Sequence, residues 1–312
     1  MARAVPAQMD ESPCLTNRQT GAFFSTWALD KGGGQCYDAS TPMIGAITGD
    51  MVGSRFEFDP IKKKDFTLLH PDCRPTDDSY MSLAVCLALL ESRSEAELPR
   101  LTVRAMQELG RAYPDGCYGG RFSRWLEEPD PQPYNSFGNG SAMRISGVAY
   151  VARSEDELRR LCRLVTEVTH NHPEGLKGAE ATAMACYMAL HGSSKEEIRA
   201  RLRADYYPMD FTLDEIRDDY EFSEICQSSV PEALQCFLES TSFEDSLRNA
   251  VSLGGDTDTQ AAIAGAVAEC FYGGVPAEIR RATEAGLDAP LLSILRRFEA
   301  RYPHPSGAPR LH

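Results

Sequence analysis

Residues 254–259 read Gly-Gly-Asp-Thr-Asp-Thr, and residues 261–268 continue as Ala-Ala-Ile-Ala-Gly-Ala-Val-Ala. The pattern predicts a tight turn that opens a buried helix with unusually small side chains. Asp256 and Asp258 then stand at the N-terminal end of this helix, where free N–H groups and the helix dipole favour carboxylates. A helix cap needs only one carboxylate. Two carboxylates and two hydroxyls in so short a stretch instead suit a hard cation such as Mg²⁺, Mn²⁺ or Ca²⁺.

Two other Asp-rich motifs fit this stretch poorly. An EF-hand calcium loop beginning at Asp256 requires Gly at the position of Ala261 and Glu at the position of Val267. An aspartate-nucleophile phosphatase motif follows a β-branched strand early in a domain. Here the motif comes late in the chain and follows Ala-Val-Ser-Leu at 250–253, so neither class is favoured.

The amino-acid composition limits the classes of protein to which this chain can belong. The chain has 312 residues, 42% of them hydrophobic and 25% charged, which is typical of a soluble globular protein. A net charge of −14 disfavours a nucleic-acid or anionic-membrane surface. No apolar run approaches the roughly 20 residues of a membrane helix, and the N-terminus lacks the apolar core of a signal peptide. The ten cysteines show no metal-ligand spacing, so we expect a cytoplasmic protein without a membrane segment.

A second signal precedes residue 60. Four residues recur at intervals of four and share one helical face: Gly45, Gly49, Gly53 and Glu57. Glycine costs about 1 kcal/mol per helix position relative to alanine, so three of them require a reason. Close approach of another backbone is the usual one, and the small-residue helix after Thr259 is the natural partner. Glu57 would then point toward Asp256 and Asp258, although a solvated Glu57 is the simpler alternative.

A third signal is Pro-Thr-Asp-Asp at 75–78, followed by a mostly apolar run at 79–90. The run predicts a buried helix whose N-terminal end is buried too. Thr76 or Asp77 as an ordinary N-cap is the simpler alternative. Burying Asp77 and Asp78 side by side without a cation would cost on the order of several kcal/mol each. The two Asp-rich helix starts and Glu57 therefore favour one cation cluster over three unrelated features.

Glycines alternate with short polar residues in Asn-Ser-Phe-Gly-Asn-Gly-Ser-Ala-Met-Arg at 135–144. Such a loop at a helix start can form a nest of N–H groups for an anion. His170 and His172 lie in a second loop. Histidines beside Pro and Gly in a loop more often form hydrogen bonds or line a pocket than bind a metal.

These patterns predict an all-α fold. Further helices are expected at Leu98–Ala112, Ser154–His170, Gly178–His191, residue 231 to Glu239, and Phe243–Leu253. Residues 206–222 are expected to form a surface excursion. One domain, a compact orthogonal multi-helix bundle with a binuclear metal site, is expected at 41–302. A weakly structured extension at 1–40, with one short helical pattern at Phe23–Leu29, precedes it, and a flexible tail at 303–312 follows.

In order and spacing, these motifs resemble the ADP-ribosyl-acceptor hydrolase (ADP-ribosylglycohydrolase) family, particularly its bacterial members related to dinitrogenase reductase-activating glycohydrolase. The resemblance covers nearly all of residues 42–300. The segments that carry it are Gly45–Gly53 with Glu57, Thr76–Asp78, Gly138–Arg144, Thr169–His170, Val230–Pro231 and Gly254–Thr259. Each is modest alone, and together they are highly specific.

The resemblance implies a compact helical fold that holds two Mg²⁺ or Mn²⁺ ions. The implied metal ligands are Thr76, Asp77, Asp78, Asp256, Asp258 and Thr259. The implied catalytic residues are Glu57, Asp77 and Asp258. The implied contacts with ADP-ribose are Gly138, Asn139, Gly140, Ser141, Met143 and His170. No metal-site position is substituted, which argues against a relative that kept the fold and lost the chemistry. His172 receives no role.

The function that follows is hydrolysis of the bond between C1″ of the distal ribose of ADP-ribose and an acceptor side chain. Two cations would orient the ribose diol and lower the pKa of a water molecule. Glu57 or an aspartate of the cluster would position or deprotonate that water. The substrate would be an ADP-ribosylated protein or a small ADP-ribosyl compound. Arginine is the first choice of acceptor, by analogy alone, and we expect a monomer.

Two rival functions remain open. A two-metal phosphohydrolase would cut the pyrophosphate, but its usual helical version needs a His-Asp dipeptide, and none of the six histidines precedes Asp. A non-catalytic ADP-ribose-binding or structural relative would release nothing. The products distinguish the three functions: free ADP-ribose, AMP with ribose phosphate, or no product.

Overall fold

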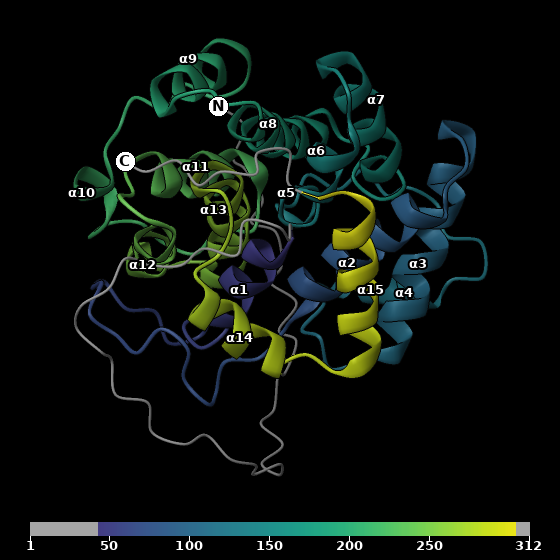
Figure 1. Ribbon diagram of the computed structural model, residues 1–312, viewed down its shortest axis with the longest axis horizontal. Coiled ribbons are helices and arrows are strands. Elements are labelled where there is room, and N and C mark those ends of the chain that lie inside the picture. The colour runs from purple at the N-terminus through teal and green to yellow at the C-terminus, as the bar shows by residue number, and fades with distance from the viewer. Residues whose placement is uncertain (1–42, 304–312) are drawn as a thin grey trace, which may run out of the picture.

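Helix α13 (Thr257–Tyr272) lies at the centre of the fold, and its residues from Thr257 to Phe271 are all buried. Because its side chains are small, α1 (Ile44–Gly53) packs directly against its backbone (Figure 1). A Cβ placed on Gly49 would lie 1.9 Å from the carbonyl oxygen of Ala261, so only glycine fits there. The other glycines of the stripe in similarly close contact with α13 are Gly45 and Gly53. The predicted pairing of these two helices is confirmed.

The computed structural model describes residues 43–303, and within them it is all-α, as predicted. The remaining α-helices are α2 (Asp77–Glu91), α3 (Leu98–Ala112), α4 (Gly120–Glu127), α5 (Gly140–Met143), α6 (Gly147–Val151), α7 (Glu155–Thr166), α8 (Pro173–Leu190), α9 (Lys195–Asp205), α10 (Leu213–Ile216), α11 (Val230–Leu238), α12 (Phe243–Leu253), α14 (Ala277–Ala285) and α15 (Ala289–Arg301). Two 3₁₀ turns lie at Glu95–Glu97 and Cys226–Ser228. In place of any strand, this part of the chain has one β-bridge, between Gly138 and Ile225.

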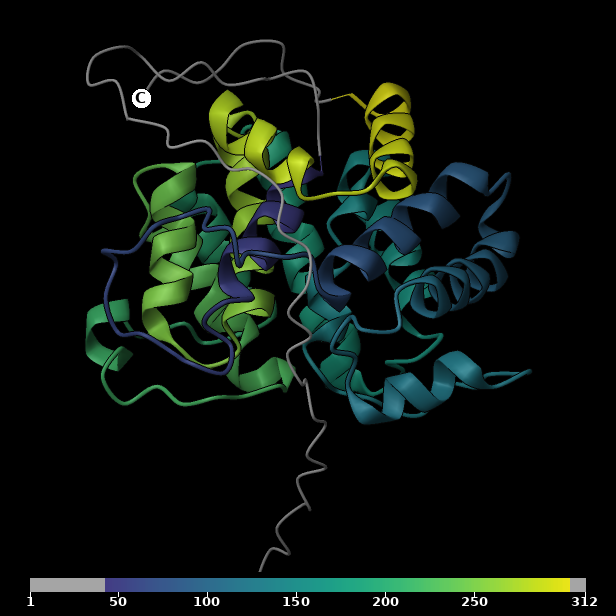
Figure 2. The same cartoon turned by 90° about the horizontal axis from the view of Figure 1, so that it is seen from below.

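The helices form two groups around α1 and α13. Helices α8, α11 and α12 pack against α13. Helix α2 packs against α1 and is covered on its other sides by α3 and α15 (Figures 1 and 2). The N-terminal ends of α2 and α13 therefore meet beside α1, which touches both helices.

The N-terminus of α1 is capped from α13 rather than from its own sequence. The carboxylate of Glu269, which is buried, accepts hydrogen bonds from the backbone N–H groups of Met43, Ile44 and Gly45 at 3.0–3.2 Å. These bonds satisfy donors that a helix end otherwise leaves free. They also fix the register of α1 on α13.

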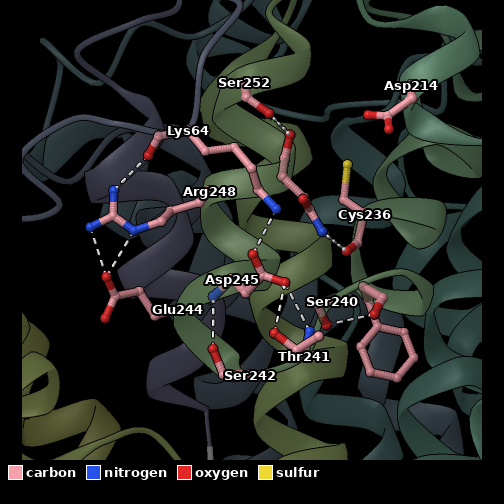
Figure 3. Close-up of polar contacts among 12 residues, drawn as sticks. Lys64, Asp214, Cys236, Ser240, Thr241, Ser242, Glu244, Asp245, Arg248 and Ser252 are labelled. Carbon is pink, nitrogen blue, oxygen red and sulfur yellow. Dashed lines mark hydrogen bonds and ion pairs between the residues drawn. The ribbon is translucent and has the colours of Figure 1, made fainter.

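The long loop between α1 and α2 is held on α12 (Figure 3). Lys64 forms an ion pair with Asp245 at 2.7 Å. The guanidinium of Arg248 donates hydrogen bonds to the carbonyl oxygens of Lys64 and Phe66, both at 2.8 Å. This anchoring holds the loop that follows α1 against the N-terminal half of α12.

Some helix boundaries differ from those that the sequence predicted. Helix α8 begins at Pro173 instead of Gly178, because His172 caps it by accepting the N–H of Glu174 at 3.1 Å and proline suits a first turn. Helix α7 ends at Thr166 rather than at His170. Residues 206–222 are more than a surface excursion, since they contain α10 and bury Tyr207, Met209 and Leu213.

The predicted extension at 1–40, with its helical pattern at Phe23–Leu29, lies outside the described residues, as does the tail from 304 onward. Between residues 43 and 303, no helix combines the length and apolar character that crossing a membrane requires.

Candidate active site

Carboxylates from three separate parts of the chain converge at the start of α13. Asp50, Asp78 and Asp258 each offer one oxygen within 4.8 Å of the others. Glu57 and Asp256 form a second such group, which shares Asp258 with the first. The three aspartates of the first group are buried. The two Asp-rich helix starts thus adjoin, although Asp78 and Asp258 are 180 positions apart in sequence.

Asp50 organises the first turn of α2. Its carboxylate accepts a hydrogen bond from the Thr76 hydroxyl at 2.6 Å and from the Thr76 backbone N–H at 2.8 Å. It also accepts the N–H of Ser79 at 3.1 Å and the Ser79 hydroxyl. Asp50 therefore caps α2 from another helix, and the Thr76 side chain makes no capping bond to its own helix.

Sequence reasoning gave Asp50 no role. A signal was present, because Asp50 directly follows a glycine of the stripe and is the one charged residue in α1. A carboxylate in a helix that otherwise reads as buried needs partners or a cation. Only the tertiary structure shows that these partners come from α2.

Asp78 carries an oxygen that no hydrogen bond satisfies. Its Oδ2 accepts a bond from the Thr259 hydroxyl at 3.3 Å, whereas its Oδ1 is buried and has no partner within the described part of the chain. Beside it, Oδ1 of Asp258 accepts the N–H of Thr259 at 2.9 Å. An unpartnered buried carboxylate oxygen is costly unless an ion or water satisfies it. This orphaned oxygen, surrounded by other oxygen donors, fits a hard cation.

Asn139 supports the cluster from the loop before α5. Its side-chain amide donates to Oδ2 of Asp256 at 2.7 Å, and its backbone N–H donates to the carbonyl oxygen of Glu224 at 2.8 Å. The side chain is buried. Asn139 is predicted to contact ADP-ribose, and in the structure its amide orients a predicted metal ligand.

Burial and mutual repulsion raise the pKa values of the clustered carboxyl groups. Burial, followed by the charge of Asp258, raises the pKa of Glu57 to about 9. Burial raises the pKa of Asp256 to about 6, and burial with neighbouring carboxylates raises that of Asp258 well above its ordinary value. Without a cation, these groups share protons. A divalent ion would remove both the repulsion and the need for those protons.

Two predicted residues take positions that the sequence did not give. Helix α1 ends at Gly53, so Glu57 lies in the turn beyond the helix rather than on its face. It still reaches Asp256 and Asp258. Asp77 is half-buried and lies outside both tight groups. Its pKa is nevertheless raised well above the ordinary value, first by burial and then by the charge of Asp258.

The loop predicted to hold an anion lies above His170. Positions for a Cβ on Gly138 and on Gly140 would be 3.6 Å from Nε2 of His170. Helix α5 has a single turn, so its dipole contributes little. The Ser141 hydroxyl donates inward to the carbonyl oxygen of Gly175 at 2.8 Å. Met143 contacts the cluster, because its sulfur lies 3.8 Å from the Thr259 hydroxyl.

The protonation state of His170 follows from Arg144. The guanidinium of Arg144 can only donate, and its Nη2 lies 3.1 Å from Nδ1 of His170. Burial, followed by the charge of Arg144, lowers the pKa of His170 well below its ordinary value. The ring is therefore neutral and carries its proton on Nε2. That N–H faces the loop at Gly138 and Gly140.

The fold and the cluster together define an all-α protein with a buried set of oxygen donors shared by α1, α2 and α13. The model of the ADP-ribosylglycohydrolase family matches residues 42–305. The chain belongs to this family, and it is an enzyme, a hydrolase of the kind that the family name describes.

Individual relatives agree with this assignment. The ADP-ribosylhydrolase ARH3 of Homo sapiens is 28% identical in an alignment of length 307 that covers 74% of this chain and 84% of the human protein. The ADP-ribosylarginine hydrolase Tri1 of Pseudomonas putida (strain GB-1) is 26% identical over 309 residues, covering 88% of this chain and 79% of that protein. A solved structure of an ADP-ribosylglycohydrolase-related protein complex superposes with a TM-score of 0.63 at 26% identity, covering 83% of this chain and 94% of that chain.

Proposed function

We propose that this protein hydrolyses the glycosidic bond between C1″ of the distal ribose of ADP-ribose and an arginine side chain of a protein, and that it requires two Mg²⁺ or Mn²⁺ ions. The observation that carries the proposal is the meeting of Asp78, with its orphaned buried oxygen, and Asp258 at the starts of α2 and α13. Family membership supports the reaction class. The metal requirement rests on the donor set, which contains only oxygens.

The residues that would hold the ions are Thr76, Asp77, Asp78, Asp256, Asp258 and Thr259. When bound, such ions orient a ribose diol and lower the pKa of a water molecule. The Thr76 hydroxyl gives its hydrogen to Asp50, so its lone pairs are free to face a cation. Asp50 and Asn139 act one step away, by fixing the orientation of Thr76 and Asp256.

Glu57 is the proposed proton acceptor. It is the member of the second carboxylate group that is only partly buried, so a water molecule can reach it. Positive charge nearby would lower its raised pKa toward the working pH. Glu57 would then take a proton from the attacking water. Asp77 and Asp258 would stabilise the positive charge that develops on the sugar.

The ADP-ribose itself is assigned to the loop at Gly138–Met143. The ring of His170 is neutral, so it supplies an Nε2–H donor next to this loop without a positive charge that would need a counter-ion. Arginine is favoured as the acceptor because the bacterial relative, which aligns over 88% of this chain, is named an ADP-ribosylarginine hydrolase. The human relative is named without an acceptor.

The decisive experiment is product analysis on two substrates, one arginine-linked and one serine-linked, with Mg²⁺, with Mn²⁺ and with EDTA. Free ADP-ribose formed faster from the arginine-linked substrate, and only with metal, is the expected result. Preference for the serine-linked substrate would mean that the acceptor is serine rather than arginine, while the type of reaction stays as proposed. AMP with ribose phosphate would identify a phosphohydrolase. No product under any condition would favour a binding protein, and full turnover in EDTA at nil metal content would refute the metal requirement.

A further inference from the structure

Three phenylalanines are the large hydrophobic residues that stand exposed among residues 43–303. The exposed fraction is 68% for Phe58, 39% for Phe137 and 53% for Phe222. Single exposed apolar residues need no explanation. These three, however, come from three different segments, and each segment borders the carboxylate cluster.

Two of the segments cover the glycines that precede Asp256. The loop after Phe58 lies over Gly254: Nζ of Lys62 donates to the carbonyl oxygens of Leu253 at 2.8 Å and Tyr220 at 2.6 Å. Residues 217–226, here named the strap, lie over Gly255. A Cβ on Gly255 would be 2.7 Å from the ring of Tyr220. Lys62 thus ties the Phe58 segment to the strap that carries Phe222.

The strap continues to the third segment. The N–H of Cys226 donates to the carbonyl oxygen of Phe137 at 3.0 Å, and the N–H of Asn139 donates to that of Glu224 at 2.8 Å. Asn139 in turn holds Asp256. The three phenylalanine-bearing segments are therefore hydrogen-bonded to one another around the same carboxylates.

Every charged side chain of the strap that forms no ion pair within the described part of the chain is acidic. Its exposed acidic residues are Asp218, Asp219, Glu221 and Glu224. None of them forms an ion pair with a residue that the structure describes, whereas Arg217 is paired with Asp214 just before them. Apart from the paired Arg217, Lys62 is the one cation recorded near these acids among the described residues: its ammonium donates to backbone carbonyls, and its charge acts on Asp218, Asp219 and Glu221. One such cation beside four acids leaves the strap negative, and an apolar ring next to such a surface complements a basic polypeptide that also presents an apolar side chain.

Phe137 differs from the other two in its contacts. Its ring packs on that of His172 with centroids 5.1 Å apart, and it precedes the loop assigned to ADP-ribose. Phe58 directly follows Glu57, the proposed proton acceptor. Phe222 has no such ring partner among the described residues. Phe58 and Phe222 are therefore available to contact the acceptor, which is the part of the substrate that leaves.

Resting on the proposed function, we propose that Phe58 and Phe222 contact the acceptor polypeptide next to the scissile bond, and that Asp218 and Asp219 select a basic segment of it. The site thus distinguishes protein substrates by the chain around the modified residue. A small substrate, which lacks that chain, makes none of these contacts.

The test compares full-length wild type with Phe58→Ser/Phe222→Ser and with Asp219→Asn. The matched charge control is Asp156→Asn, an exposed acid on α7 without an ion pair among described residues. The substrates are ADP-ribosylated free arginine and two peptides modified at one arginine, flanked by lysines or by glutamates. The expected result is a rise of about tenfold in KM for the lysine-flanked peptide in the double variant, with kcat/KM on ADP-ribosylarginine within about twofold of wild type.

Charge selection gives a second readout. Asp219→Asn should reduce the preference for the lysine-flanked over the glutamate-flanked peptide, and Asp156→Asn should not. The preference of wild type should also fall as salt is added. Melting temperatures of all variants confirm that each protein is folded.

The remaining outcomes overturn the inference in distinguishable ways. Wild type inactive on every substrate, ADP-ribosylarginine included, would refute the proposed function and this inference with it. Active wild type with unchanged peptide KM in the double variant would refute this inference alone. A change of molecular mass in light scattering would assign the phenylalanines to contact between copies of the chain. Faster cleavage of ADP-ribosylarginine by the double variant would mean that another segment of this chain covers them.

Discussion

Helices α12 and α13 are consecutive, and each follows an N-cap residue of a type that commonly caps helices. The side chains of these two N-cap residues nevertheless bind different partners. Ser242 accepts the N–H of Asp245 at 3.1 Å and so caps its own helix, α12. Asp256 makes no bond to the N–H groups of α13 and accepts instead from Asn139. Thr76 at the start of α2 likewise turns away from its own helix.

The difference teaches that burial decides what a polar helix start does. Ser242 is partly exposed, and a local hydrogen bond is the cheapest partner that it can find. Asp256 is only 6% exposed and has other carboxylates as neighbours. At such a buried position the side chain does not cap its own helix and binds a partner from another part of the fold. Four predictions separate these two kinds of helix start.

The largest effect is expected from Asp77→Asn and Asp258→Asn. If the starts of α2 and α13 serve one centre, each substitution should lower turnover by about a thousandfold or more, and the double variant should be scarcely slower. Initial rates of the four proteins of this cycle check it, together with melting with and without Mg²⁺. Metal should stabilise each variant less than wild type. Additive rate losses with equal metal-induced shifts would show that the two starts do not cooperate.

The next effect tests what brings the two starts together. Gly49→Ala places a Cβ 1.9 Å from the carbonyl oxygen of Ala261, so α1 must move away from α13. We expect a loss of about 3 kcal/mol or more in the free energy of unfolding and a smaller stabilisation by metal. Gly119→Ala is the control, since a Cβ there meets nothing within 4 Å. Urea denaturation measures both, and equal stability of the two variants would contradict the close packing.

The dependence of stability on pH comes third. Burial and Asp258 raise the pKa of Glu57 from 4.5 to about 9, so the folded metal-free protein binds this proton more tightly than the unfolded chain does. Its contribution to stability is therefore present below about pH 4.5 and is lost as the pH rises through about 9. The melting temperature in EDTA should fall between pH 6 and pH 9.

Glu57→Gln has no proton to lose, so its melting temperature should fall less over the same range. Glu128→Gln, at an exposed position, should behave as wild type does. A profile for Glu57→Gln that coincides with wild type would rule out Glu57 as a source of the dependence. Because metal binding displaces the protons, added Mg²⁺ should stabilise wild type more at high pH than at low pH.

The smallest effect is expected at the ordinary cap. Ser242→Ala removes the bond to Asp245 N–H and should cost about 1 kcal/mol of stability. Turnover and the stabilisation by Mg²⁺ should stay as in wild type, because Ser242 belongs to neither group of clustered carboxylates. Chemical denaturation and initial rates check both. A loss of turnover comparable to that of Asp258→Asn would erase the distinction between the two kinds of helix start.

Much of the fold could be predicted because its signals are local. The apolar run after Asp78 predicts α2, and the glycine stripe predicts both α1 and its close contact with α13. Boundaries were less secure: α8 begins at Pro173, although a proline at the first turn is a recognised start signal. The carboxylates of the site could be listed from residue type and spacing. Their association could be inferred, since burying them separately is costly.

By itself, the sequence determined the all-α class, the pairing of α1 with α13 and the residue types of a cation cluster, because helical periodicity and glycine spacing act over a few residues. Only the tertiary structure decided that Asp50 caps α2, that Asn139 turns to Asp256, and that Glu57 reaches the cluster from beyond the end of its helix. These contacts join residues that are 26 and 117 positions apart in the first two cases. No local pattern encodes such a distance, because it is set by how closely whole helices pack.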